Sequence, residues 1–139
     1  MQADELVDTY LRALRTFDAD LAVSLFAAGG VVNSPLYGPM PATRFYPALF
    51  ADTGDARLTL RSVMRGVDQT GTPTVGFWFH FDWRLPTGVA APFEVVDVAR
   101  LDGDGRILEL AIVYDTVDVR PAFEAATGRR SWRAAGPAD

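Results

Sequence analysis

Asp97 sits among neighbours that suggest chemistry rather than packing. Residues 93–101 alternate as a β-strand does, which puts Phe93, Val95 and Asp97 on one face, with Asp97 as its only charged group. A carboxyl group in an apolar row either finds a hydrogen-bond donor or has its pKa raised until it is neutral. We therefore interpret Asp97 as a candidate functional residue. The alternative is an edge position, or a carboxylate satisfied by an arginine or by the backbone.

The residue types that are missing narrow the chemistry further. The chain has no cysteine, all 13 of its basic residues are arginine, and its single histidine is His80. These facts exclude thiolate chemistry, a lysine Schiff base and metal motifs built on histidine pairs. No phosphate-binding glycine loop occurs either. We therefore expect no cofactor and no metal, and chemistry carried by carboxylates, tyrosines, hydroxyls and water.

Composition predicts one ordinary globular domain. The chain has 139 residues, of which 49% are hydrophobic, and a net charge of −5. The acidic charge argues against nucleic acid as a partner, and no apolar run approaches the roughly 20 residues that span a bilayer. The acidic start, residues 1–5, lacks the basic end of a signal peptide, so we expect a cytoplasmic protein. The one basic stretch, residues 129–133, is typical of a solvated tail.

The first half of the chain predicts three helices and one short strand. Apolar residues at helical spacing predict a helix over 3–17 with Tyr10 on its apolar face. A second helix is predicted to start at Asp18 or Asp20, to run through Phe26 and to end at Gly29-Gly30. A strand over 31–34 and a loop over 35–42 follow. The third helix is predicted over 43–51, with Pro47 in its first turn and Phe50 on its buried side.

The second half predicts four strands, over 57–67, 74–85, 92–101 and 106–115, with a tight hairpin turn at 102–105. Helices grouped before an antiparallel sheet predict an α+β fold. We expect a cone in which the N-terminal helices pack on a curved antiparallel sheet and enclose a cavity. The domain is predicted to cover 1–120. Residues 121–139 are predicted to form a short, partly disordered C-terminal extension.

The strand over 74–85 has two distinct faces. One carries Phe77, Phe79, Phe81 and Trp83, which predicts an interior row, either plain core or the wall of a pocket for a flat apolar ligand. The other carries Trp78, His80, Asp82 and Arg84. A histidine and a carboxylate could act as acid and base, but burial of the aromatic row favours an exposed ion-pair ladder or a dimer interface for this second face.

Two tyrosines and one further carboxylate complete the candidates. Tyr10 is either a core tyrosine or a hydroxyl donor aimed into the cavity. Tyr114 belongs to a row that is predicted to face inward, with Leu108, Leu110 and Ile112. Asp115 follows at the predicted strand end, where the direction of the side chain is open.

Residues 95–107 resemble the penultimate hairpin of ketosteroid isomerases, within the NTF2-like and SnoaL-like superfamily, and residues 10–35 resemble the start of the same enzymes. The resemblance covers most of residues 6–118. It implies a cone-shaped α+β fold, usually dimeric, with an apolar cavity. It also implies that Tyr10 and a protonated Asp97 form an oxyanion hole and that Tyr114 is an aromatic pocket position. Ser34 stands where those enzymes have their base aspartate, and an unactivated serine is a poor base.

Two other members of the superfamily share features with the chain. Limonene-epoxide hydrolases use an asparagine before an x-Pro, an Arg-x-Asp pair and a late aspartate, and these elements resemble Asn33-Ser34-Pro35, His80-x-Asp82 and Asp115. SnoaL-type polyketide cyclases also carry a late aspartate, which resembles Asp115. These resemblances imply hydrolysis of an epoxide or cyclisation of a polyketide.

The sequence thus leads to one preferred hypothesis, a cofactor-independent acid–base enzyme of isomerase or cyclase type that acts on an apolar ring-containing substrate. Neutral Asp97 and Tyr10 would bind a substrate oxygen, and the proton acceptor would be Asp115 or a water held by Asn33 and Ser34. The substrate would lie against Phe50, Phe77, Phe79, Phe81, Trp83 and Tyr114. The alternatives are an epoxide hydrolase, a non-catalytic binding domain and a dimerisation scaffold. The expected partners are a hydrophobic small molecule and a second copy of the chain, with no nucleic acid and no membrane.

Overall fold

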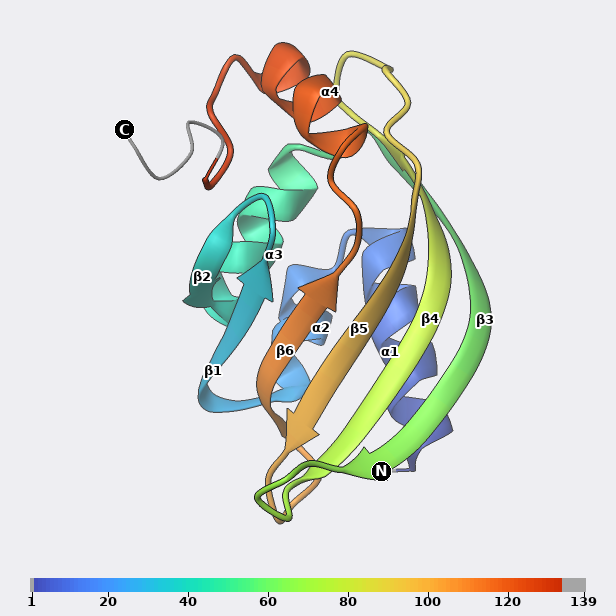
Figure 1. Cartoon of the computed structure of the whole chain (residues 1–139), viewed down its shortest axis with the longest axis vertical. Coiled ribbons are helices and arrows are strands. Elements are labelled where there is room, and N and C mark those ends of the chain that lie inside the picture. The colour runs from blue at the N-terminus through green and yellow to red at the C-terminus, as the bar shows by residue number, and fades with distance from the viewer. Residues whose placement is uncertain (1, 134–139) are drawn as a thin grey trace.

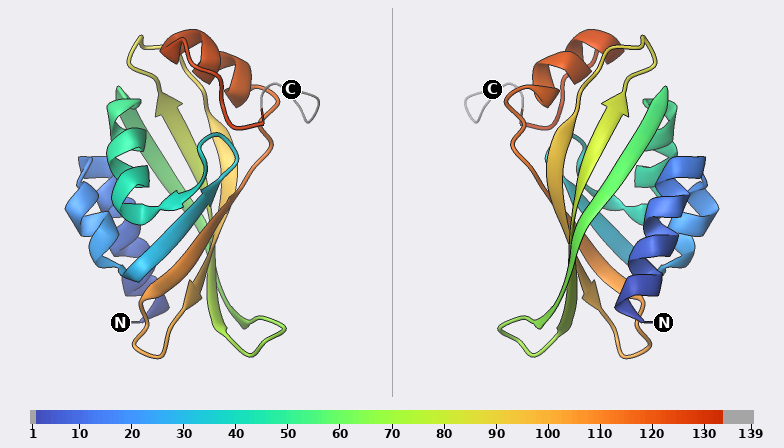
Figure 2. Two further views of the ribbon diagram at one scale, coloured as in Figure 1. Left: turned by 90° about the vertical axis from the view of Figure 1, so that its left-hand side faces the viewer. Right: turned by 90° about the vertical axis from the view of Figure 1, so that its right-hand side faces the viewer.

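A strongly curved, six-stranded sheet organises the molecule, with helices on its concave side (Figures 1 and 2). The structure is a computed structural model and describes residues 2–133. In chain order the elements are α1 (Ala3–Thr16), α2 (Ala19–Ser24), β1 (Phe26–Ser34), β2 (Gly38–Pro41), α3 (Ala42–Ala51), β3 (Asp55–Val67), β4 (Pro73–Arg84), β5 (Phe93–Leu101), β6 (Ile107–Val113) and α4 (Val119–Thr127).

The strands lie in the order β2-β1-β6-β5-β4-β3. Neighbouring strands are antiparallel except β1 and β6, which run parallel. The second half of the chain is therefore a meander of consecutive strands, as the alternating pattern and tight turns predict. The parallel pair joins that meander to the first half of the chain. The α+β prediction is confirmed.

Three helices and the sheet enclose the core. The apolar stripe of α1 is buried, including Tyr10, Leu11 and Leu14, and the Arg15 side chain donates to the Leu58 carbonyl of β3 at 3.2 Å. Asp18, one of the two aspartates predicted to start α2, caps it by accepting from the Leu21 N–H at 3.0 Å. In Figures 1 and 2, α1, α2 and α3 lie on the concave side, and α4 crosses one end of the cone.

The prediction for residues 26–42 is wrong in two respects. Gly29 and Gly30 do not end a helix, because α2 ends at Ser24 and both glycines lie within β1. Gly29 has φ +75° at a bulge where the β1–β6 register shifts between Phe26 and Val31. The predicted loop over 35–42 contains β2, which pairs with β1 across a tight turn. The proline-rich composition concealed this edge strand, since proline is tolerated at sheet edges.

Two further differences concern α3 and β6. The helix α3 begins at Ala42, so Pro47 lies inside it rather than in its first turn. The strand β6 ends at Val113, so Tyr114 and Asp115 follow it. A bulge in the β5–β6 register also turns Leu108 outward, where it is 40% exposed, while Ile107 is buried. The predicted inward row is therefore wrong at Leu108.

The C-terminal part of the described chain is ordered on the body of the molecule. Phe123 of α4 is buried, and Trp132 donates its backbone N–H to the Leu36 carbonyl at 2.7 Å. Partial disorder was predicted for residues 121–139, and residues 134–139 of that range lie outside the described residues.

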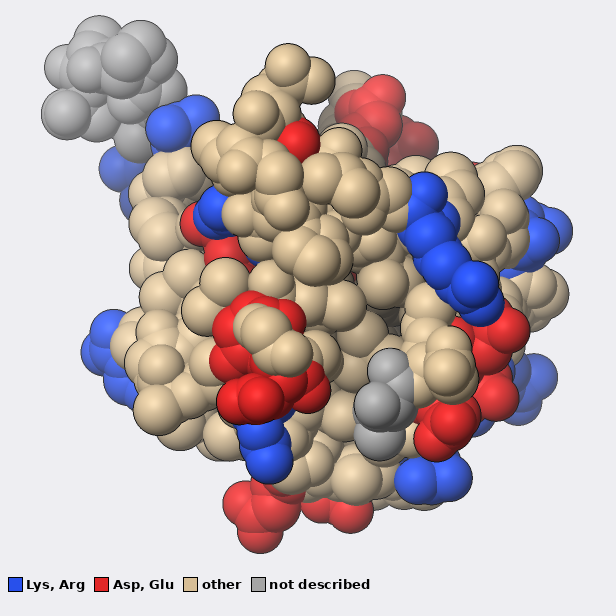
Figure 3. All heavy atoms as spheres, turned by 90° about the horizontal axis from the view of Figure 1, so that it is seen from below, with Lys and Arg blue, Asp and Glu red and all other residues tan. Residues whose placement is uncertain are grey.

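No helix within residues 2–133 is long and apolar enough to cross a membrane. The end of the molecule opposite α4, viewed in Figure 3, carries groups of acidic and basic side chains separated by uncharged surface.

Candidate active site

An apolar cavity lies between the helices and the inner face of the sheet. Its aromatic wall consists of Phe45, Phe79, Phe81, Trp83, Phe93 and Tyr114. Its aliphatic lining consists of Leu14, Leu36, Leu49, Val95 and Ile112, and its polar groups are Tyr10, Ser34, Tyr37 and Asp97. The cavity volume is about 40 Å³, which is room for roughly three water molecules. A ring-containing ligand must therefore widen the cavity as it enters.

Asp97 is the only carboxylate that lines this cavity within the described part of the chain. It pairs with Phe77 of β4 and Ile112 of β6, and residues opposite one another in antiparallel strands share a face, so its side chain points inward. Asp97 is 1% exposed, and its Oδ1 atom has no hydrogen-bond partner. Burial raises its pKa to about 8, against an opposing contribution from the nearby Tyr10 hydroxyl. Below that pH the group is a neutral acid.

Tyr10 and Tyr46 form a buried hydroxyl pair beside Asp97. The Tyr46 hydroxyl donates to the Tyr10 hydroxyl at 3.0 Å, and both side chains are at most 2% exposed. Because Tyr46 supplies the proton of that bond, the proton of Tyr10 is directed elsewhere. Burial raises the pKa of both tyrosines, so both remain neutral donors. The Tyr10 ring also meets the Phe77 ring edge-on, with centroids 5.3 Å apart.

Ser34 and Tyr37 line another part of the cavity. The Ser34 Oγ atom accepts from the Leu36 and Tyr37 backbone N–H groups, each at 3.2 Å, which fixes the turn between β1 and β2. The Tyr37 hydroxyl donates to Asp52 Oδ2 at 2.7 Å, away from Asp97. The Tyr37 hydroxyl therefore already donates a hydrogen bond, whereas the Oδ1 atom of Asp97 has no hydrogen-bond partner.

Seven of the predicted site residues line the cavity together: Tyr10, Ser34, Phe79, Phe81, Trp83, Asp97 and Tyr114. Tyr114 stacks on Phe93 with ring centroids 4.1 Å apart. Burial raises the Tyr114 pKa, so this tyrosine too is neutral. Elements far apart in the chain thus meet around one apolar space.

Four other predicted residues are placed away from the cavity. Asn33 follows the alternation of β1, so its side chain points to the opposite face from Ser34, and the two cannot hold one water in the cavity. Asp115 is exposed past the end of β6, and its Oδ1 accepts from the Val117 N–H at 2.9 Å. Phe50 stacks on Phe17 with centroids 5.7 Å apart, and Phe77 lies behind Tyr10 in the core.

The His80 face of β4 points away from the cavity, as the burial of the aromatic row predicts. His80 Nδ1 contacts Glu94 Oε2, and Arg61 donates through Nε to Glu94 Oε1 at 2.7 Å. The Trp78 indole N–H also donates to Glu94 Oε1, at 3.0 Å. His80 and Asp82 therefore belong to an outer polar surface, and Arg84 contacts Asp82 there at 3.5 Å.

Sequence reasoning missed the polar role of Tyr46. The helical pattern over 43–51 predicted a buried side for this helix but gave no sign that a tyrosine hydroxyl on it meets that of Tyr10. The signal was available in the requirement that a buried tyrosine hydroxyl find a partner. Phe93 is the other omission: the sequence placed it on the same face as Val95 and Asp97 but not among the residues expected to contact the ligand, and it lines the cavity.

Metal binding has no ready set of ligands. Over residues 2–133, no group of three or more histidine, aspartate or glutamate side chains is placed to hold a metal ion. The arrangement that the residues do form is a buried neutral acid and a buried phenol, side by side in an apolar space. That pair can donate two hydrogen bonds to one oxygen atom.

Comparison with known proteins places this geometry in a family. The model of the SnoaL-like domain matches residues 7–110. No curated protein matches the chain. Solved structures give the fold. A protein with a ketosteroid isomerase-like fold from Catenulispora acidiphila DSM 44928, in complex with trimethylamine, has 17% identity and a TM-score of 0.71, over 89% of this chain and 92% of that one.

Two further solved structures have enzyme names. An M. tuberculosis epoxide hydrolase of the LEH-like type has 20% identity and a TM-score of 0.65, over 89% of this chain and 90% of that one. The epoxide hydrolase/cyclase-like enzyme SalBIII, with a role in pyran ring formation in the polyether salinomycin, has 16% identity and a TM-score of 0.67, over 84% and 92%. Such identities carry the fold alone. On the match over most of its length, the chain belongs to the SnoaL-like domain family and has the NTF2-like fold.

Proposed function

We propose that the chain is a cofactor-independent acid–base enzyme, of isomerase, cyclase or epoxide-opening type, that acts on a small apolar ring-containing molecule. The observation that carries the proposal is Asp97, a carboxyl group 1% exposed, with an unpartnered Oδ1 atom in an apolar cavity. An unsatisfied buried polar atom costs stability, and a role in binding or catalysis accounts for keeping one. A substrate oxygen would complete the bonding of Asp97 and Tyr10.

The single carboxyl group favours acid activation among these reactions. Asp97 would give its proton to a substrate oxygen, such as an epoxide oxygen, as the carbon–oxygen bond to it breaks. A water molecule or a hydroxyl group of the substrate would form the new carbon–oxygen bond and release its own proton, which restores the acid. Proton abstraction from carbon would need a separate base, and no second carboxylate lines the cavity within residues 2–133. The epoxide hydrolase and cyclase names of the structural relatives agree with this order of preference.

Tyr10 would act as the second donor. Its hydroxyl is oriented by the bond from Tyr46 at 3.0 Å, so little reorganisation is needed when negative charge develops on the substrate oxygen. Removal of one such donor costs roughly 10²- to 10³-fold in turnover in comparable sites. Asp115 would have no part in the transfer unless the chain beyond β6 changed direction.

A non-catalytic binding domain is the second candidate, favoured because no carboxylate other than Asp97 lines the cavity among the residues that the structure describes. Such a domain would hold the same oxygen-bearing ligand by the same two donors. Turnover separates the candidates, since both predict binding.

A panel of epoxides, enones and polyketide-like aromatic compounds tests the proposal, together with Asp97→Asn, Tyr10→Phe and the matched control Glu94→Gln. Asp97→Asn keeps the shape of the group but removes its acid, so we expect at least about a 10²-fold loss of turnover. In the wild type we expect activity to fall as pH rises through about 8. Unchanged turnover in both cavity variants would overturn the proposal, and binding without any turnover would favour the second candidate.

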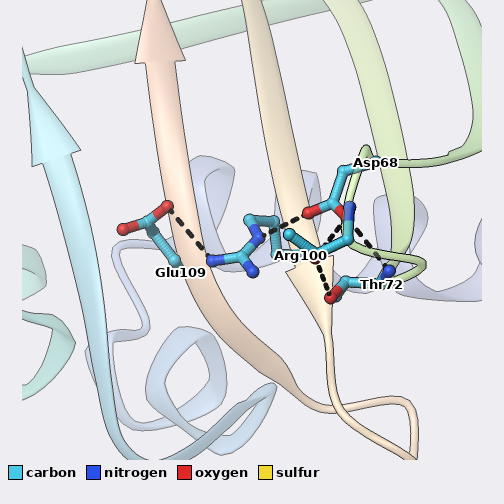
Figure 4. A network of polar contacts seen from close by, with 5 residues as sticks. Asp68, Thr72, Arg100 and Glu109 are labelled. Carbon is cyan, nitrogen blue, oxygen red and sulfur yellow. Dashed lines mark hydrogen bonds and ion pairs between the residues drawn. The ribbon is translucent and has the colours of Figure 1, made fainter.

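The outer sheet face is the proposed surface for a homodimer. Exposed apolar side chains lie across it, including Met64, Trp78 and Val113. Ion pairs flank them, with Arg61 and Glu94 on one side and the network of Asp68, Thr72, Arg100 and Glu109 on the other (Figure 4). An apolar stripe between charged rims is typical of a subunit interface. Sedimentation of the wild type and of Trp78→Ala tests the assignment. Cytoplasmic residence stays a prediction.

A further inference from the structure

The cavity contains a second polar group without a partner, the hydroxyl of Tyr114. Tyr114 lines the cavity, and its hydroxyl makes no hydrogen bond with any residue from 2 to 133. The other hydroxyls of the lining already take part in bonds: Ser34 accepts from two backbone N–H groups, Tyr37 donates to a carboxylate, and Tyr10 accepts from a neighbouring tyrosine. In the described part of the chain, the Tyr114 hydroxyl therefore shares with the Oδ1 atom of Asp97 a bonding capacity that is unused.

Tyr114 and Asp97 lie at different levels along the sheet. Ile112 pairs with Asp97, and Tyr114 comes two residues later in the chain. The Tyr114 ring stacks on Phe93, which lies four residues before Asp97 on the antiparallel strand β5, with centroids 4.1 Å apart. A strand rises about 3.4 Å per residue, so the Tyr114 side chain lies roughly 7 to 14 Å along the sheet from the level of Asp97. Figure 1 shows the direction, since β6 runs toward α4 and β5 starts at that end.

Apolar side chains occupy the space between these two levels. In the register of β4 with β5, Phe79 pairs with Val95 and Phe81 pairs with Phe93. All four side chains line the cavity, and none of them carries a hydrogen-bonding group. A flat ring system that lies against them would therefore meet one polar group at each end.

The Tyr114 hydroxyl lies toward α4 and keeps its proton. Burial raises its pKa, and the positive charge of Arg120 on α4 opposes that rise, which indicates that the hydroxyl points to the α4 end of the cavity. The Arg120 guanidinium itself is engaged by Ser131 and by two backbone carbonyls. A neutral phenol donates one hydrogen bond and accepts another, so Tyr114 can bind a carbonyl, ether or hydroxyl oxygen.

Space for a longer ligand lies beside the cavity. A second hollow, of about 300 Å³, shares Leu36 and Tyr37 with the cavity and is lined further by Phe123 of α4 and residues 129–132. Residues 129–132 therefore form part of a wall, whereas the composition of that stretch predicts a solvated tail. A ligand that widens the cavity meets this space on the α4 side.

We propose that Tyr114 determines specificity: its hydroxyl binds a second oxygen of the substrate, at the end of the ring system that lies away from Asp97 and Tyr10. The inference rests on the proposed function and deepens it, because it narrows the substrate class to ring compounds with oxygen at both ends. A ligand without the second oxygen would displace water from the Tyr114 hydroxyl and leave it unpartnered, which weakens binding. Sites that hydrogen-bond a substrate group reject analogues lacking that group for the same reason.

Two probe compounds test the proposal on the full chain by calorimetric titration at pH 7. 2-Naphthol and naphthalene-2,6-diol share the ring system and one hydroxyl group, and only the diol has an oxygen at the opposite end. Tyr114→Phe removes the hydroxyl and keeps the ring that stacks on Phe93. The matched control is Tyr37→Phe, which removes a hydroxyl of the same cavity that already donates to Asp52 at 2.7 Å.

We expect the wild type to prefer the diol, and Tyr114→Phe to reduce that preference by about threefold to tenfold, the contribution of one neutral hydrogen bond. The diol can enter either way round in both proteins, so its symmetry cancels in the comparison. Tyr37→Phe should keep the preference. Failure of the diol to bind the wild type, an unchanged preference in Tyr114→Phe, an equal reduction in Tyr37→Phe, or a loss of affinity for both probes alike in Tyr114→Phe would overturn the proposal.

Asp97→Asn separates this inference from the proposed function. If Asp97→Asn kept the turnover of the wild type while Tyr114→Phe removed the preference for the diol, the proposed function would fail and the role of Tyr114 would stand. If Asp97→Asn lost turnover while Tyr114→Phe kept the preference, the role of Tyr114 would fail and the proposed function would stand.

Discussion

Glu94 and Asp97 lie on opposite faces of the same strand and have opposite acid–base behaviour. Glu94 of β5 faces solvent, and hydrogen bonds from Arg61, His80 and Trp78 lower its pKa to about 2. Asp97 faces the cavity, where burial raises its pKa to about 8. Three residues of sequence therefore separate a permanent anion from an acid that is neutral at physiological pH.

The difference teaches that surroundings, rather than residue type, decide which carboxyl group can do acid chemistry. The outer face surrounds its carboxylates with donors, as the Asp68 and Arg100 contact at 3.0 Å also illustrates. The inner face leaves Asp97 Oδ1 without any donor among the described residues. A charge is stabilised on one side of the sheet and suppressed on the other.

The largest expected effect concerns the pH dependence of stability. Asp97 has a folded pKa of about 8, and an unfolded aspartate has one of about 3.9, so between these pH values only the folded state retains the proton. The contribution of Asp97 is fully present below pH 4 and is lost as pH rises through about 8. Against Asp97→Asn, the wild type should lose stability on the order of 5 kcal/mol over that range, as an upper figure. Urea unfolding at several pH values measures it.

The control for that experiment is Glu94→Gln. Because the folded pKa of Glu94 is about 2, its contribution is present above the unfolded pKa and is lost only as pH falls toward 2. This variant should therefore leave the profile from pH 5 to 9 unaltered. A wild type and an Asp97→Asn variant with parallel profiles would mean that Asp97 is not a buried acid.

The next effect compares two adjacent aromatic residues of β4. Phe79 is 2% exposed and Trp78 is 41% exposed. Phe79→Ala should cost about 3–5 kcal/mol, because it leaves a void in the cavity wall, whereas Trp78→Ala should cost less than about 2 kcal/mol. Thermal or urea unfolding measures both, at two protein concentrations, since a dimer would make the Trp78 value concentration-dependent. If Phe79→Ala and Trp78→Ala lowered the free energy of unfolding equally at both protein concentrations, the assignment of Phe79 to the inner face and Trp78 to the outer face would be contradicted.

A smaller effect is expected within the cavity itself. Tyr10→Phe removes the acceptor of the Tyr46 hydroxyl and leaves that buried group unpartnered, at a cost of about 1–3 kcal/mol. Tyr46→Phe should cost less, because the Tyr10 hydroxyl keeps its proton for Asp97 or a ligand. Binding of 2-naphthol should weaken more in Tyr10→Phe than in Tyr46→Phe. The reverse order, by unfolding and by calorimetry, would refute the direction assigned to the bond.

The smallest effect is expected on the outer face. Arg61→Gln removes the contact with Glu94, where both side chains are at least 40% exposed, so the loss of stability should be small and should shrink with added salt. Unfolding in low and high salt checks this, with Arg57→Gln for comparison. A loss of several kcal/mol that salt does not alter would show that the outer cluster is not solvated.

Alternation predicted the inner face of the site well. The period of two put Asp97 in an apolar row and the rings of β4 on one side of the strand. The structure agrees, because side chains alternate between the two faces of a strand, so burial of the apolar row leaves the other row toward solvent. The spacing of apolar residues likewise predicted that Tyr10 lies on the buried stripe of α1. These predictions depend on local periodicity, which a single chain reports directly.

The remaining features required long-range information. The bond between Tyr46 and Tyr10 joins two helices, so local periodicity could not reveal it. Asn33 is different, because alternation within the predicted strand already puts it on the opposite face from Ser34. Asp115 became a candidate through its resemblance to a late aspartate, while the sequence left its direction open at the end of a strand predicted over 106–115; the strand ends earlier, at Val113. The basic stretch over 129–133 has the composition of a solvated tail, and only its contacts with Leu36, Gly38 and Arg120 reveal that it is held against the body of the molecule.

The parallel pairing of β1 with β6 has a consequence for how the molecule acquires its shape. Val31 pairs with Glu109 and Val32 with Leu110. This part of the sheet can therefore form only after β6, which is synthesised much later than β1. Contacts this distant along the chain slow folding. Until β6 emerges from the ribosome, one edge of β1 is unpaired and Asp97 has no enclosed space around it, which makes the nascent chain prone to association at that edge.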